Sequence, residues 1–176
     1  MNQKMKNVVK AMMAAEEFVS HAVAAKTKIY AMHDIDADGI DLSRVSASEH
    51  NQYMKYVSNA EEGLQDEIML LESKVAYVKH YGANDMLGDK YNGLPDAKQD
   101  EAQELADNIE GSLGIILSAT SELESIVSGD LEDPDEFDRV VEEIKKEASE
   151  LKANVSKMHG LSKITMEMSN DMAMEH

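Results

Sequence analysis

Apolar residues recur every three or four positions in four long stretches of the chain, and no stretch shows sustained alternation of polar and apolar residues. This spacing places residues on one face of an α-helix, whereas a half-buried strand would alternate. The four apolar stripes are Val8, Met12, Ala15, Val19, Ala22, Lys26, Ile29 and His33; Tyr53, Val57, Ala60, Leu64, Ile68, Leu71, Val75 and Val78; Ala102, Leu105, Ile109, Leu113, Ile116, Thr120, Leu123 and Val127; and Phe137, Val141, Ile144, Ala148, Leu151, Val155 and Met158. The pattern predicts four helices, each of which must bury a narrow stripe against another helix.

Local signals mark the helix ends. Ser46 and Glu49 form a capping-box pattern, Pro134 suits a first helical turn, and Gly82 and Gly129 follow predicted helix ends. These signals place the helices at about residues 4–33, 47–81, 97–127 and 134–158, with the last continuing to about 172.

The connections between these helices are short enough for antiparallel neighbours. We therefore expect one all-α domain over residues 1–176, an up-down-up-down bundle with coiled-coil-like packing. It consists of a hairpin at about 4–81, a turn-rich linker at 82–96 and a hairpin at about 97–172. The alternative is two extended hairpins that complete their cores only against other subunits.

The end of the chain is rich in methionine. Of 13 Met, four (Met166, Met168, Met172 and Met174) lie in the last eleven residues. Positions 161, 164, 168 and 172 share one helical face, and the polarizable Met side chain suits adaptable contacts. This face either covers its own bundle or docks on a neighbouring subunit, with Leu161, Ile164, Met168 and Met172 as the expected partner contacts.

Charge is abundant and uneven. The formal net charge is −18, with a net of +3 over residues 1–33 and −14 over residues 96–150. Such a field opposes direct nucleic-acid binding. The acidic segment either lies beside the basic first helix and faces solvent, or meets a basic partner as an acidic inhibitor, a chaperone or a nucleic-acid mimic would.

Targeting signals are weak. No apolar run approaches the ~18 residues of a membrane-spanning helix. Lys4, Lys6 and Lys10 precede an apolar run that Glu16 ends too early for a signal peptide, which needs roughly 7–15 apolar residues. We expect a cytoplasmic or virion-associated protein.

The sharpest local motif lies between the first two predicted helices. Asp34, Asp36 and Asp38 alternate and are followed by Gly39. Alternate carboxylates in a tight turn can converge on Ca²⁺, which takes six to eight oxygen ligands. This segment resembles the first half of an EF-hand loop, and the resemblance implies calcium binding. It makes the three Asp side chains and the carbonyl of Ile40 ligands.

The rest of the loop departs from the EF-hand. Asp41 stands at an apolar position, Val45 replaces the bidentate Glu at the twelfth position, and Glu49 comes four residues later. The match covers about eight residues, so we expect at most a shorter site, completed by Asp41 or Ser43, or an acidic turn without metal.

The sequence contains no pattern typical of a catalytic site. Without Cys there is no disulfide, thiol nucleophile or Cys-ligated metal. No phosphate-binding loop and no Glu-x-x-His pair for a di-metal bundle occurs, and Glu17 and His21 are one residue too far apart. We therefore expect a protein that is not an enzyme.

The pattern favours a structural or interaction subunit of a larger protein assembly, homo- or hetero-oligomeric, with a phage virion as the expected setting. The alternatives are a small helical calcium-binding module that uses the Asp34–Asp41 loop and an acidic inhibitor or chaperone of a basic partner.

Overall fold

The computed structural model describes residues 2–37, 47–129 and 133–174, and every regular element within them is an α-helix. The elements are α1 (Gln3–Ala37), α2 (Ala47–Val78), α3 (Ala83–Leu87), α4 (Asp89–Asn92), α5 (Asp96–Ser128) and α6 (Pro134–Met174). The all-α prediction is confirmed, and the four long helices correspond to the four apolar stripes.

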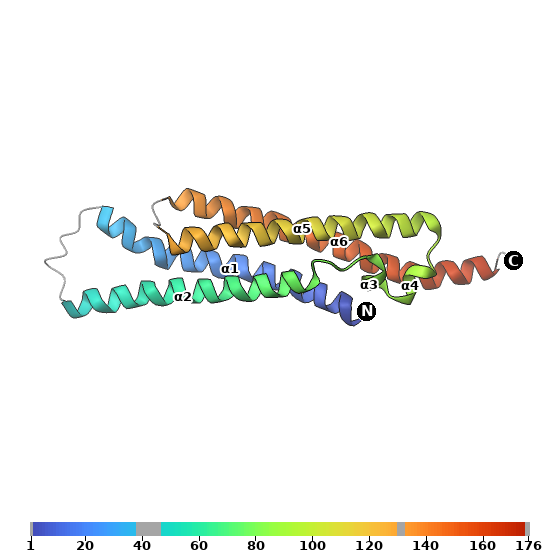
Figure 1. The fold of residues 1–176 in the computed structure, drawn as a ribbon, viewed down its shortest axis with the longest axis horizontal. Coiled ribbons are helices and arrows are strands. Elements are labelled where there is room, and N and C mark those ends of the chain that lie inside the picture. The colour runs from blue at the N-terminus through green and yellow to red at the C-terminus, as the bar shows by residue number, and fades with distance from the viewer. Residues whose placement is uncertain (1, 38–46, 130–132, 175–176) are drawn as a thin grey trace.

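The long helices surround one common core. Helix α1 packs against α2 and α6, and α5 packs against α6 and α2. The order around the core is therefore α1, α2, α5, α6, with the α1–α2 pair on one side and the α5–α6 pair opposite. Figure 1 shows the N-terminus, α3, α4 and the C-terminal part of α6 at the same end of the molecule.

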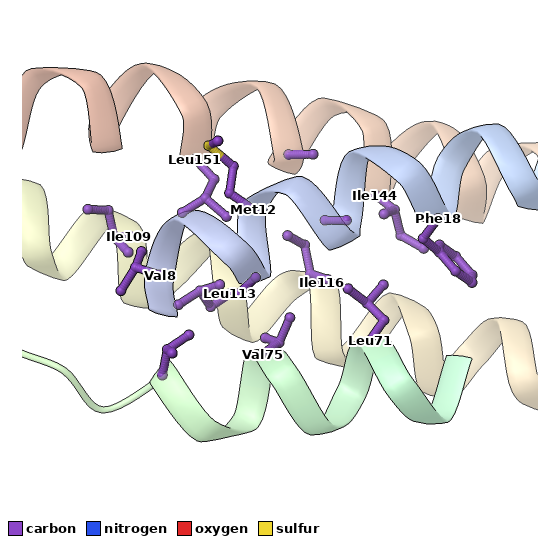
Figure 2. Packing of buried hydrophobic residues seen from close by; sticks show 14 of the residues in the cluster. Val8, Met12, Phe18, Leu71, Val75, Ile109, Leu113, Ile116, Ile144 and Leu151 are labelled. Carbon is purple, nitrogen blue, oxygen red and sulfur yellow. The ribbon is translucent and has the colours of Figure 1, made fainter. Parts of the chain in front are cut away.

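The predicted stripes form the core. Every stripe residue of α5 and α6 is buried, and the described stripe residues of α1 and α2 are buried or half-buried. In Figure 2, Val8 of α1, Val75 of α2 and Leu113 of α5 point into the same interior. The two hairpins thus share a core. The buried faces are wider than the stripes, since they also include Met5, Phe18 and Val140.

Two helix ends differ from the predicted ones. Helix α1 continues to Ala37 rather than ending near residue 33. Helix α2 ends at Val78 rather than near residue 81, because the Tyr81 N–H donates to the Val78 carbonyl in a tight turn at 3.1 Å.

The predicted turn-rich linker contains the short helices α3 and α4. They form because Met86, Leu87 and Leu94 reach the main core and are buried there. The carboxylate of Asp85 accepts from the Gly82 N–H at 2.9 Å at the start of α3. Gly88 separates the two helices with φ +61° and ψ −139°, a conformation that a side chain would disfavour. The linker is therefore part of the packed structure.

Candidate interaction surfaces

Part of the predicted calcium loop lies outside the described residues. Helix α1 extends through Asp34 and Asp36, whose side chains are not among the described ones, and Asp38, Ile40 and Asp41 fall in the undescribed segment. Across the described part of the chain, no three His, Asp or Glu side chains are grouped so that they could hold a metal. Calcium binding stays a prediction.

The predicted tail contacts fall into two groups. Leu161 is only 2% exposed and belongs to the core of its own chain, so its assignment as a partner contact is corrected. The reason is that α6 continues without interruption past Gly160 and keeps Leu161 in its apolar stripe. Ile164, Met168 and Met172 lie further along α6, whose last turns extend beyond the other helices in Figure 1.

A basic groove runs between α1 and α2 on the outer side of the molecule. We call it the Lys10–Tyr77 groove; it has a volume of about 220 Å³ and is lined by Asn7, Lys10, Ser73, Lys74, Tyr77 and Val78. Its two charged side chains are both basic. Tyr77 is 70% exposed, and its ring meets the Tyr81 ring edge-on with centroids 6.4 Å apart. The groove therefore combines positive charge with an exposed aromatic ring.

Exposed apolar side chains gather on the same helix pair. Among the described residues the large exposed ones are Met13, Val23, Met69, Leu70, Tyr77 and Ile115. All except Ile115 belong to α1 or α2. The core stripes gave no indication of this bias, because these residues lie between the stripe positions. A local signal existed in the adjacent apolar pair Met69 and Leu70, because both lie between the stripe residues Ile68 and Leu71 and neither follows the core spacing.

Further along the α1–α2 pair, His21 faces an acid from the neighbouring helix. Its Nδ1 lies 3.0 Å from Oε1 of Glu67 on α2. The sequence offered only Glu17, which lies on the same helix as His21. The inter-helix partner came from packing, and the pair is ionic when His21 is protonated.

An acidic groove lies between α5 and α6, opposite the basic one. We call it the Asp107–Glu150 groove; it has a volume of about 470 Å³ and is lined by Asp107, Asn108, Gly111, Ser112, Ile115, Glu147, Glu150, Ala153, Asn154 and Lys157. Gly111 faces open space, since a Cβ there would meet nothing within 4 Å. The absence of a side chain at Gly111 therefore widens this groove.

One acid of this groove is nearly buried. Glu147 is 6% exposed, and Ser112 of α5 hydrogen-bonds to its carboxylate. Burial raises the pKa of Glu147, and the nearby Glu150 raises it further, while the bond from Ser112 partly offsets the effect. The groove floor is therefore a carboxylate that is more easily protonated than usual.

The basic first helix lies directly beside α6. Lys26 Nζ is 2.6 Å from Asp138 Oδ2, and Lys152 Nζ is 3.6 Å from Glu16 Oε1. This explains the interruption of the α1 stripe by Lys26: its position borders the α1–α6 contact, where its ammonium group meets an acid. The remaining acids of α5 and α6 are largely exposed.

Comparison with known proteins gives no relative for this chain: no family model, no curated protein and no solved structure matches it. Among the described residues, no helix is both long enough and apolar enough to cross a membrane.

Proposed function

We propose that the protein is a non-enzymatic structural subunit of a larger protein assembly. The observation that supports this proposal is the length of α6, whose last turns project past the other helices. In the C-terminal part of α6, Ile164, Met168 and Met172 recur at four-residue spacing and so belong to one helix face. A helix end that extends past the rest of the bundle and has an apolar face in its sequence is suited to packing against another subunit.

Within this proposal the four long helices form an up-down-up-down bundle with coiled-coil-like packing, one domain over residues 1–176. The two hairpins make a stiff rod, and the surfaces left after the core has formed make the contacts. The phage virion remains a predicted setting.

The test is a pair of double variants in α6, with mass measured by light scattering. We expect Met168→Asp with Met172→Asp to lower the mass of the assembly, because two charges would be buried at the contact. Met166→Asp with Asn170→Asp adds two Asp residues to the same turns on the opposite face and serves as the control. Equal effects of both pairs would contradict the assigned face.

The same measurement in calcium and in chelator separates the alternatives. A mass well above that of the monomer in both conditions supports the assembly subunit. A monomer in both conditions, at every concentration, contradicts self-assembly and favours the acidic inhibitor or chaperone of a basic partner. A monomer whose melting temperature rises only with calcium favours the module that uses the Asp34–Asp41 loop.

A further inference from the structure

We propose that the basic Lys10–Tyr77 groove of one molecule binds the acidic Asp107–Glu150 groove of a second copy of the same chain. The inference rests on the proposed function and adds the partner and the contact surfaces. It starts from charged side chains that form no ion pair within the described part of their own chain.

The charges of the two grooves are complementary. Lys10 and Lys74 provide the charge of the α1–α2 groove, and neither forms an ion pair within the described residues. Asp107 and Glu150 lie on the opposite groove and are likewise without an ion pair in that part of the chain. The acidic groove contains Lys157 as its one basic lining residue. The pairing of the grooves would place the unpaired lysines against unpaired carboxylates.

The apolar side chains of the grooves also complement each other. Tyr77 projects from the basic groove, and Ile115, 39% exposed, lines the acidic one. Tyrosine is enriched among the residues that dominate protein–protein binding energies. Gly111 leaves space beside Ile115 that an aromatic ring from another molecule can enter. The contact therefore has an apolar centre surrounded by charge pairs.

The position of the grooves determines the kind of assembly. They lie on opposite sides of the molecule, because the α1–α2 pair and the α5–α6 pair face each other across the core. They also lie at a similar level along it, because Lys79 Cε of α2 is 3.7 Å from the position that a Cβ on Gly114 of α5 would take. A contact between two different faces leaves one of each free on every dimer, so it continues from copy to copy. The expected product is an open stack of molecules.

The overall negative charge does not prevent this contact at moderate salt. At physiological ionic strength charges more than about 8 Å apart are largely screened, so the facing groups dominate. The net charge of −18 then acts mainly against non-specific clustering.

Charge reversal tests the proposal. One double variant, Lys10→Glu with Lys74→Glu, makes the basic groove acidic; the other, Asp107→Lys with Glu150→Lys, makes the acidic groove basic. Each alone then presents two like-charged faces. By light scattering at about 0.15 M NaCl, we expect each variant alone to form smaller particles than the wild type at equal concentration. An equimolar mixture should recover the wild-type mass.

The mixture is the decisive measurement, because recovery requires both variants to be folded and their faces to pair. A variant that assembles alone as well as the wild type, or a mixture that stays small while both variants keep wild-type helical content by circular dichroism, overturns the inference. If a double variant loses its helical content, Tyr77→Ser replaces it. If the Tyr77→Ser variant has the same mass as the wild type at equal concentration, the contact is contradicted. At least a tenfold rise in the protein concentration that the variant needs for assembly would support it.

Failure of this inference is distinguishable from failure of the proposed function. If the charge-reversal variants still assemble but Met168→Asp with Met172→Asp does not, the groove contact is contradicted and the proposed assembly subunit is supported. A wild type that is monomeric at every concentration contradicts both.

Discussion

The buried carboxylate of Glu147 lowers the stability of the folded state when it is ionised. Its carboxylate is nearly buried between α5 and α6, where Ser112 supplies a hydrogen bond and Glu150 adds repulsion. The sequence did not single it out, because it occupies a position next to Ala148 of the stripe and looked like one more surface acid. Only the approach of α5 buries it.

Replacement of this acid by its amide should stabilise the protein at neutral pH. Because the folded state raises the pKa of Glu147 above its ordinary value of 4.5, the ionised form is a penalty at pH 7 that disappears as the pH falls below that value. We expect Glu147→Gln to melt above the wild type at pH 7. The difference should vanish near pH 4, about where an unshifted Glu protonates.

Glu142→Gln on the same helix is the control, because it removes an equal charge from an exposed position. Subtracting its effect corrects for the lower net charge. Equal gains in melting temperature for both variants would show that burial of Glu147 does not oppose folding.

The long helices could be predicted from the sequence, whereas the short ones could not. The long helices follow from apolar spacing over many turns, a local pattern that is visible in the sequence. Helices α3 and α4 have five and four residues, too few for such a pattern. Burial of Met86 and Leu87 holds α3 against the main core, and α4, which buries no residue itself, lies between the buried Leu87 and Leu94. This is why the linker looked like a turn.

Two glycines should respond oppositely to alanine. Gly88 has positive φ, and a Cβ there would lie 3.2 Å from Asn2 Nδ2, so Gly88→Ala should cost about 1–2 kcal/mol. Gly160 lies inside α6 with open space around it, so Gly160→Ala should add roughly 0.5–1 kcal/mol.

Thermal melts monitored by circular dichroism report both changes, at about 2–4 °C per kcal/mol for a protein of this size. Gly160→Ala is the matched control, because it introduces the same methyl group. Destabilisation by Gly160→Ala would mean that the position needs a glycine, for example at a bend in α6.

At the scale of the whole molecule, the distribution of charge determines how added salt changes the stability of the fold. Two ion pairs join α1 and α6, Lys26 of α1 with Asp138 and Lys152 of α6 with Glu16. Most acids in the described parts of α5 and α6 nevertheless form no ion pair. The compact state therefore carries substantial self-repulsion.

Added salt should consequently stabilise the fold. Between about 0.02 and 0.5 M NaCl the screening length drops from beyond 10 Å to a few ångströms. Because exposed ion pairs contribute little, relief of repulsion should dominate and raise the melting temperature by roughly 2–4 °C. A falling melting temperature at constant protein concentration would instead mean that pairs such as Lys26–Asp138 outweigh the repulsion.

Helix type, approximate helix ends and the core stripes followed from the sequence, because helical periodicity relates residues only a few positions apart. Val8, Leu64, Ile109 and Ile144 were all expected in the core and are buried. The exposure of Tyr77, the burial of Glu147 and Leu161 and the two grooves on opposite faces depended on contacts between residues far apart in the chain. Such contacts arise from how whole helices pack, which local spacing does not encode.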